Sequence, residues 1–430
     1  MRTVPVRNGD SVTTTMSTIS RLEDVLAPHT IADFVAQYWG KKPLFIRGSR
    51  TKFENLYSLD QFLAVLDRPG SVLGKPKLHA SFDKRGSTGL TPTLPIAPRD
   101  ARAAYAAGAT VCMNRLEEHE PALAALVARF RIALGYPGDM HVNAYWSPHG
   151  AGFLPHFDAR IATTLQIHGS KKWRYGRRAE IAWPHDNAHL VEGKVVYDRA
   201  GARESWEEAL SPEALTDLDE ANLEPGDVLS IPAGTIHEAL AEGSSFALNF
   251  TFNRLPVGTY LSALLAREFG ARPEWRYVRP LSSNVGTEEH GPTANAELRT
   301  RLRETIAYLQ ELDADPRKLT RLAALELAST TTVPDEPLPS TPLTLKTEVC
   351  ASPFVVVASR FDEDPLIVIV RGQKIEASGT TASLLRHLLG TRSVTVASLA
   401  EATSFGRAEL LDALGDLETI GFVRRVGSNR

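Results

Sequence analysis

Two motifs indicate the architecture of this chain: Gly152-Phe-Leu-Pro-His-Phe-Asp158 and Pro225-Gly-Asp-Val-Leu-Ser-Ile-Pro-Ala-Gly-Thr-Ile-His237. His156 and Asp158 are two residues apart, so in an extended chain their side chains point to the same face. The second stretch is typical of a tight turn, a buried strand and another turn that ends on His237. Two imidazoles and one carboxylate bind one face of an octahedral iron(II) ion and leave positions open for other ligands. His-x-Asp is common by chance and His237 alone would be an ordinary core histidine, but together they are predicted metal ligands.

The segment around these residues has the pattern of short strands. Apolar runs bounded by Gly, Pro, Asp and Asn occur at 140–146, 163–167, 172–175, 228–231 and 246–252. No long helical pattern separates them, which predicts a jelly roll or barrel rather than a parallel sheet. Residues 177–222 are rich in charge and are expected to form an insertion.

Helical patterns precede this segment. Apolar residues recur at helical spacing at 31–39, 57–68 and 121–135. Residues 69–100 are rich in Gly, Pro, Thr and Lys and predict a long loop that covers the site as a lid. Its basic residues would attract an acidic substrate or simply form a solvated face, and the solvated face is the more frequent case.

Helical patterns return after the strands. Residues 256–332 are dense in Leu, Ala, Arg and Glu, and the proline-rich segment 333–342 is typical of a linker. Residues 343–430 contain strand-like runs at 353–359 and 365–370, then three helical patterns and a final strand, which suggests a winged helix. The expected domains are therefore a tail (1–20), a catalytic domain (21–255), a helical domain (256–332), the linker (333–342) and a C-terminal domain (343–430).

Composition limits the classes of function. The chain has 430 residues, a net charge of -3, 43% hydrophobic and 23% charged residues. This balance fits a globular protein of two or three domains and gives no polycationic signal for nucleic acid. The two cysteines, Cys112 and Cys350, are too few for a disulfide framework and fit a reducing cytoplasm. No apolar run has the length of a signal peptide or membrane span, and the polar residues 1–20 predict a disordered tail.

Four motifs together resemble a known family. They are Tyr38-Trp-Gly-Lys-Lys-Pro-Leu-Phe-Ile-Arg47, Gly152-Phe-x-Pro-His-Phe-Asp158, Leu165-Gln-x-x-Gly-x-Lys-x-Trp173 and Pro225-Gly-Asp-x-Leu-x-Ile-Pro-x-Gly-x-x-His237. The chain resembles the JmjC/cupin class of 2-oxoglutarate oxygenases, and within it the bacterial ribosomal oxygenase group, which hydroxylates side chains of ribosomal proteins. The resemblance implies Fe(II) as cofactor, with 2-oxoglutarate and O2 as cosubstrates. It implies a mainly β catalytic core (a double-stranded β-helix of the jelly-roll or cupin type), a helical dimerisation segment and a C-terminal winged helix, in a homodimer.

The resemblance also assigns roles to single residues. His156, Asp158 and His237 match the iron ligands, and Lys171 matches the basic residue that pairs with the far carboxylate of 2-oxoglutarate. Of Lys171 and its neighbour Lys172, one should be solvated, because neighbours on a strand face opposite sides. Asn143 matches a pocket asparagine that helps to bind the cosubstrate. The same pocket is expected to include two residues that structural hydrogen bonding would explain equally well, Asn249 and Thr251.

The chain departs from the family after the His-x-Asp motif. Ser170 replaces a common basic residue, and more acidic and aromatic character is expected where Arg160, Ile161 and Thr163 stand. These departures concern the prime substrate rather than the iron. Candidate substrate contacts, each of which a structural role would also explain, are Tyr145, Trp146, Arg160 and His168.

Three other functions remain open. The same metal site would serve a hydroxylase of a natural-product precursor peptide, with the C-terminal domain as a peptide-docking module. A winged-helix regulator would need a basic recognition helix, but the candidate helix at 407–419 is acidic, so direct DNA binding is not expected. A cupin that binds metal without turnover would have no need of Lys171.

Overall fold

The computed structural model describes residues 19, 21–68, 77–82, 93–191, 194–197, 216–276, 291–334 and 339–426. The chain divides into two compact units, Met1–His119 with Val142–Thr251 and Glu120–His141 with Phe252–Arg430. Most of the expected tail, residues 69–76 and 83–92 of the expected lid, residues 198–215 of the expected insertion and residues 335–338 of the expected linker lie outside the described residues.

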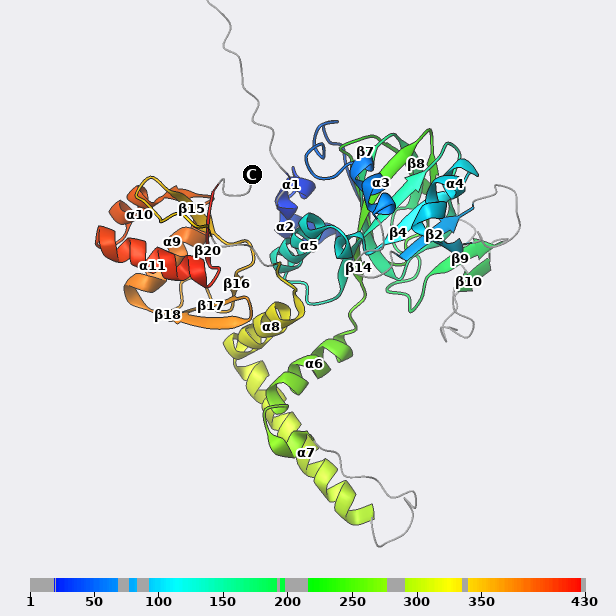
Figure 1. Ribbon diagram of the computed structural model, residues 1–430. Coiled ribbons are helices and arrows are strands. Elements are labelled where there is room, and N and C mark those ends of the chain that lie inside the picture. Colours follow the sequence, from blue (N-terminus) through cyan, green and yellow to red (C-terminus); the bar gives the residue numbers. More distant parts are fainter. Residues whose placement is uncertain are drawn as a thin grey trace, which may run out of the picture. The chain divides into compact units, whose positions relative to one another are not determined.

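An eight-stranded sheet is the larger of two sheets in the first unit (Figure 1). Its spatial order is β1 (Leu44–Ile46), β12 (Val228–Ile231), β7 (Arg160–His168), β14 (Ser245–Asn253), β5 (Met140–Ser147), β4 (Thr110–Asn114), β2 (Lys77–Ser81) and β3 (Thr93–Ile96). The ladders of β12 with β1 and β7, and of β2 with β3 and β4, are antiparallel. The strands predicted from the apolar runs are found, as β5, β7, β12 and β14 here and β8 in the second sheet.

The second sheet has six antiparallel strands and contains the predicted metal ligands. Its order is β10 (Lys194–Tyr197), β9 (Ala188–Val191), β6 (Gly152–Phe157), β13 (His237–Ala241), β8 (Lys171–Gly176) and β11 (Leu218–Leu223). Trp173 and Tyr175 of this sheet pack with Leu229 and Ile231 of the larger one in a shared apolar core. Two antiparallel sheets that share a core are the jelly-roll architecture expected from the sequence.

The expected turn before β12 shows why this sequence folds locally as it does. Gly226 has φ +95°, and a Cβ there would lie 1.9 Å from the Ser49 carbonyl oxygen, so only glycine fits. The fully buried carboxylate of Asp227 accepts hydrogen bonds from the backbone N–H groups of Glu224 and Gly48 and from Arg47. One side chain therefore closes the turn and attaches it to the end of β1.

The expected loop and the expected insertion both contain strands in the described residues. Within the expected lid, β2 and β3 form an antiparallel pair, because Leu78 and Ala80 alternate into the core of a stretch with little apolar content. Within the expected insertion, β9, β10 and β11 belong to the six-stranded sheet. Their charged residues, such as Glu220, lie on the solvent side, which hid the alternation.

The helices of the first unit are short. They are α1 (Leu22–Leu26), α2 (Ile31–Asp33) with a π-helical continuation (Phe34–Tyr38), α3 (Leu59–Asp67), α4 (Ala101–Ala106) and the 3-10 turns Pro98–Asp100 and Leu116–Glu118. Thr30 caps α2 and Ser58 caps α3 by accepting a hydrogen bond from the third residue of each helix. The helices predicted at 31–39 and 57–68 are thus confirmed.

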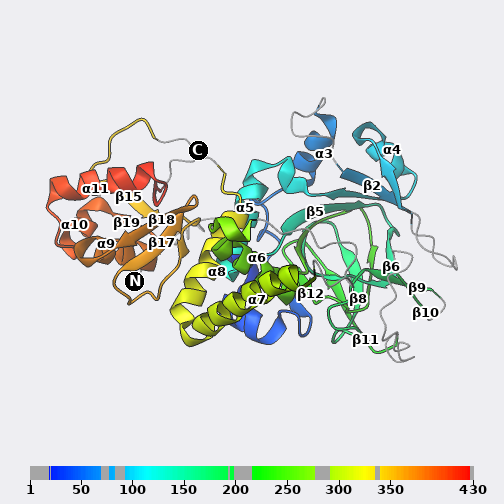
Figure 2. The same ribbon diagram turned by 90° about the horizontal axis from the view of Figure 1, so that it is seen from below.

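The second unit begins with helices. They are α5 (Pro121–Leu134), α6 (Val257–Phe269), the 3-10 turn Pro273–Trp275, α7 (Gly291–Ala314) and α8 (Pro316–Thr330). Helices α6, α7 and α8 lie side by side (Figures 1 and 2) and bury a common cluster that includes Leu264, Tyr308 and Leu322. In the described part of the chain, no helix is both long and apolar enough to cross a membrane.

The C-terminal part of this unit has two small sheets and three helices. The sheets are β16 (Val356–Val357), β17 (Leu366–Val370) and β18 (Gln373–Ala377), and β19 (Val394–Thr395), β15 (Glu348–Ala351) and β20 (Val423–Arg425). The helices are α9 (Gly379–Gly390), α10 (Val396–Ala402) and α11 (Arg407–Thr419). They surround one apolar core that includes Leu385, Leu399 and Leu414. The three predicted helices and the final strand are confirmed, whereas β15, β18 and β19 were not expected.

Candidate functional site

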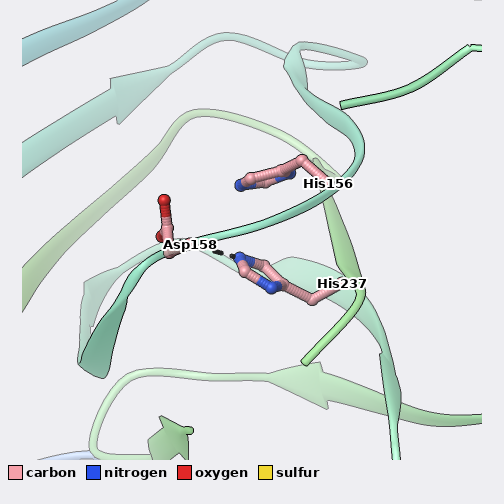
Figure 3. A group of neighbouring side chains, drawn as sticks. All are labelled: His156, Asp158 and His237. Carbon is pink, nitrogen blue, oxygen red and sulfur yellow. Dashed lines mark ion pairs between the residues drawn. The ribbon is translucent and has the colours of Figure 1, made fainter. Parts of the chain in front are cut away.

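Strand register brings the two predicted histidine ligands together. Strands β6 and β13 pair so that His156 lies directly opposite His237. Their ring centroids are 4.2 Å apart (Figure 3). The close backbone approach at Gly152 fixes this pairing, because a Cβ there would lie 1.7 Å from the Ala239 carbonyl oxygen.

Each histidine is oriented by the carbonyl group two residues before it. His156 Nδ1 lies 2.8 Å from the Leu154 oxygen, and His237 Nδ1 lies 2.9 Å from the Thr235 oxygen. A carbonyl oxygen only accepts hydrogen bonds, so Nδ1 is the protonated nitrogen in both rings. The neutral tautomer that results presents the lone pair of Nε2 to a metal.

Asp158 completes the cluster just after β6. Its Oδ2 lies 4.0 Å from His237 Nε2, and ligand atoms of all three residues lie within 4.8 Å of one another (Figure 3). Its Oδ1 accepts a hydrogen bond from Arg160 at 3.2 Å. Burial acts to raise the pKa of this carboxyl, but Arg160 and the two histidines outweigh it and lower the pKa to about 2.

This donor set fits a divalent metal ion. Burial, reinforced by the neighbouring His237, lowers the pKa of His156 to about 3, and burial also lowers the pKa of His237. At neutral pH both rings are therefore neutral and Asp158 is ionised, which are the forms that bind a metal. Two imidazoles and one carboxylate on one side of the ion leave other positions open, as in non-haem Fe(II) sites.

The three side chains line a cavity of about 200 Å³. Its other described lining residues are Ser81, Thr93, Tyr145, Phe153, Arg160, Thr164, Lys171, Trp173, Asn187, His189, Ala239, Ala247 and Asn249. The lining combines an apolar and aromatic wall with a few polar groups, which is typical of a small-molecule site.

Lys171 is the buried cation of this cavity. It is 2% exposed, and its Nζ donates to Ser147 Oγ at 3.0 Å. Burial lowers the pKa of its amino group to about 8. Within the described residues no carboxylate pairs with it, so the cavity has a buried positive charge that an anionic ligand would neutralise. Lys172 faces the other way and pairs with Glu220 at 2.9 Å, so one lysine of the two is solvated, as predicted.

The predicted pocket residues Asn143, Thr251 and Asn249 form a buried hydrogen-bonded chain. Asn143 Nδ2 donates to Thr251 Oγ1, Thr251 donates to Asn249 Oδ1, and Asn249 Nδ2 donates to Thr164 Oγ1. Of the three, Asn249 lines the cavity, while Asn143 also accepts a hydrogen bond from the backbone of Arg115. The structure thus places Asn143 and Thr251 behind Asn249 rather than at the cavity wall.

The four predicted substrate contacts separate into two pairs. Tyr145 and Arg160 line the cavity. Trp146 faces the other side of β5 and stacks on Tyr105 with centroids 3.8 Å apart, and His168 is exposed at the end of β7. The structure therefore does not bring Trp146 or His168 to the cavity.

Several residues of the site were not foreseen. Ser147, which holds Lys171 and accepts a hydrogen bond from Thr110, lies two residues after Tyr145, so strand alternation would have indicated it. Asn187 and His189 line the cavity from the region taken for an insertion. They reach the site through pairing of β9 with β6, which no local sequence signal reveals.

Comparison with known proteins gives a family for the core of the chain. Residues 125–259 match the model of the JmjC domain. The uncharacterized protein YxbC of Bacillus subtilis is 26% identical over 328 residues, which cover 72% of this chain and 97% of YxbC. Ribosomal oxygenase 1 of Gallus gallus is 28% identical over 278 residues, 60% of this chain and 42% of that protein. Bifunctional lysine-specific demethylase and histidyl-hydroxylase NO66 of Aedes aegypti is 26% identical, and this chain spans about a third of its length.

Solved structures share the fold over nearly the whole chain. YcfD of Escherichia coli has a TM-score of 0.53 at 18% identity, covering 92% of this chain and 98% of YcfD. A structure of YcfD described as a ribosomal oxygenase in complex with cobalt and 2-oxoglutarate has a TM-score of 0.52 at 18% identity, covering 93% and 99%. Residues 125–259 thus match the JmjC domain, and the chain is similar to proteins named ribosomal oxygenase.

Proposed function

We propose that this protein is an Fe(II)- and 2-oxoglutarate-dependent oxygenase that hydroxylates an amino-acid side chain of a protein or peptide. The observation that carries the proposal is that one cavity contains both a set of possible metal ligands and a buried cation. The cluster of His156, Asp158 and His237 is the donor set of a non-haem iron site, and the same cavity contains the buried cation Lys171. A metal site without turnover would have no need of that lysine.

The residues of the chain would divide the work as follows. His156 and His237, held neutral with Nε2 free of protons, and the ionised Asp158 would hold the iron. Lys171, braced by Ser147, would bind the far carboxylate of 2-oxoglutarate through a charge-assisted hydrogen bond. When bound, iron and 2-oxoglutarate use O2 to convert a C–H bond of the substrate to C–OH, with release of succinate and carbon dioxide.

The test of this proposal is release of succinate from 2-oxoglutarate in air with Fe(II). Asp158→Ala and His237→Ala should abolish it and should also abolish binding of Mn(II), measured by titration without oxygen. His168→Ala is the matched control, because this histidine is exposed and does not line the cavity. Unchanged turnover in both ligand variants would contradict the assignment.

For the substrate, a ribosomal protein is the first candidate. The support is the likeness to proteins named ribosomal oxygenase. A precursor peptide of a natural product is the second candidate, because Arg160, one of the departures from the family after the His-x-Asp motif, lines the cavity. A gain of one oxygen atom, detected by mass spectrometry in cells with and without the enzyme, would show which class is modified.

We further propose that residues 343–430 form a winged helix that contacts protein rather than DNA. The face of α11 presents the exposed acidic residues Glu409, Asp412 and Asp416, which would repel phosphates. Salt-dependent binding of duplex DNA by the whole protein would contradict this.

A homodimer built on the helical segment is also part of the proposal. Leu298, Leu302, Ile306 and Leu309 lie on one face of α7 and are 40–59% exposed. Such a stripe is costly in water unless another surface covers it. Ile306→Glu should convert the dimer to a monomer, as measured by light scattering. Thr300→Glu, on the opposite face of α7, should leave the dimer intact. A wild-type protein that is monomeric at micromolar concentration would exclude the dimer.

A further inference from the structure

We propose that Asn187 is a positioning residue for Asp158, which it holds at the metal through the backbone of Ala159. The inference rests on the proposed metal site and deepens it, because it names the group that sets the direction of the carboxylate ligand. A side chain that comes from the start of β9 would thereby help to determine how tightly the ion is bound.

Asp158 lies at the point where a regular strand has just ended. The ladder between β6 and β9 stops with Phe157 opposite Ala188, so no strand partner fixes the residues beyond it. The N–H of Ala159 donates instead to Oδ1 of Asn187, at 2.9 Å. A backbone N–H that is partly withdrawn from water needs an acceptor, and here a side-chain amide takes the place of the next ladder bond.

The peptide group that follows Asp158 is held at both of its polar ends. At one end the Asp158 carbonyl accepts a hydrogen bond from the Gly234 N–H at 2.8 Å, and at the other end the Ala159 N–H meets Asn187. A peptide group is planar, so two bonds at opposite ends fix its rotation, and with it the ψ angle of Asp158. The side chain leaves the same α-carbon, so these bonds also direct the carboxylate toward the two histidine rings (Figure 3).

Asn187 has a rigid base from which to hold this peptide group. The residues next to Asn187, Asp158 and His237 in the sequence pack together in one apolar cluster, and each is 0% exposed: Ala188, Phe157 and Ile236. The strands that carry the three polar residues are therefore kept at a fixed separation. A short side chain on a packed strand can set the position of a neighbouring backbone more closely than one on a loop.

Two other contacts act on the carboxylate itself and have to be separated from the role of Asn187. Arg160 donates to Oδ1 of Asp158 at 3.2 Å, and Oδ2 lies 4.0 Å from Nε2 of His237. Neither contact involves the backbone. Removal of the Asn187 bond therefore leaves both contacts available and frees the peptide group alone. A hydrogen bond that orients a metal ligand contributes roughly 10–100-fold to metal affinity.

The experiment measures metal binding by the whole protein without oxygen. Mn(II) titration gives dissociation constants, and the visible absorption spectrum of the Co(II) form reports the geometry of the ligands around the ion. Asn187→Leu and Asn187→Ala remove the acceptor with and without a similar volume, and Asn187→Asp keeps an oxygen in the same place. Asn222→Leu is the matched control, because Asn222 is exposed and bonds the exposed Glu242.

Both variants without an acceptor should bind Mn(II) about tenfold or more weakly than wild type and show an altered Co(II) spectrum. Asn187→Asp should bind at least as tightly as wild type, because its oxygen still accepts from Ala159 and its charge favours a nearby cation. Thermal unfolding without metal separates this role from support of the fold. A merely structural residue would lower the melting temperature and leave the dissociation constant of the folded protein unchanged.

Three results would overturn the inference: unchanged Mn(II) binding in the variants without an acceptor, an equal loss in Asn187→Asp, or failure of both acceptor-free variants to fold. In the last case the bond would hold the sheet rather than the ligand. Succinate release is measured on the same samples. If wild type releases none and the expected order of Mn(II) affinities is found, the oxygenase assignment fails while the positioning role stands. If wild type releases succinate and every variant binds Mn(II) equally, the positioning role alone fails.

Discussion

Replacing Lys171 with methionine should stabilise the protein when it has no ligand and remove its response to 2-oxoglutarate. The amino group is 2% exposed and its pKa is lowered from 10.5 to about 8 by burial. At about 1.4 kcal/mol for each unit of pKa, the buried charge costs the folded state roughly 3 kcal/mol at pH 7. Methionine has a similar length, no charge and a flexible chain that fills the same space.

The sign of the effect with pH follows from the same values. The folded-state pKa lies below the unfolded one, so between pH 8 and 10.5 the unfolded chain binds more protons and stability rises with pH. The gain from methionine should be complete below about pH 8 and should disappear above about pH 10.5. In thermal unfolding, each kcal/mol shifts the melting temperature by about 2–4 °C for a folding unit of 150–250 residues.

The assay is thermal unfolding with Mn(II), with and without excess 2-oxoglutarate. Wild type should gain about 2.7 kcal/mol when the ligand is present at a hundred times its dissociation constant, and Lys171→Met should gain far less. Lys172→Met is the matched control, because that lysine is exposed and paired with Glu220 on the outer face. A destabilised Lys171→Met protein that still responds to 2-oxoglutarate as wild type does would refute the reasoning.

Three further predictions concern the cosubstrate and the scaffold. The KM for 2-oxoglutarate should rise as pH passes above about 8, where Lys171 loses its proton, and steady-state kinetics of Lys171→Arg should show a flatter profile. Gly152→Ala should prevent pairing of β6 with β13 and abolish Mn(II) binding, whereas Gly243→Ala, with open space at its Cβ, should not. Asp227→Asn should lower the free energy of unfolding by about 1–3 kcal/mol in urea titrations, because the buried carboxylate joins the turn to Arg47 and Gly48. Glu224→Gln is the control, because the ion pair of Glu224 with Arg50 is exposed, and an equal loss of stability in that variant would contradict the prediction.

The elements that the sequence predicted well are those with a continuous apolar signal. Strands β12 and β14 are buried along nearly their whole length, so most of their residues are apolar or small. Strand β2 was missed because its core residues alternate with Lys77 and His79. Strands β9 to β11 were missed because the charges of their exposed faces dominate the composition of that region.

The residues of the site also differ in how well the sequence predicts their positions. The meeting of His156, Asp158 and His237 in one cluster could be predicted because two longer motifs of turn and strand residues occur together in the chain, although His-x-Asp alone is common. Trp146 could have been excluded, since it neighbours Tyr145 in a strand and must face the other way. Asn187 and His189 could not be predicted, because pairing of β9 with β6 brings them to the cavity from some thirty residues further along the chain. Long-range register is a property of the folded sheet and has no local signature.

The hydrogen bond from each ligand histidine to the carbonyl two residues upstream has a consequence for how this site can vary. Leu154 and His156, like Thr235 and His237, form self-contained units in which three residues set both the direction and the tautomer of the ring. Neither hydrogen bond uses an atom of the eighty or so residues that lie between the two units. Insertions and deletions in the intervening loops can thus change which molecules reach the metal and leave its coordination intact, whereas one residue inserted inside either unit would turn the ring away.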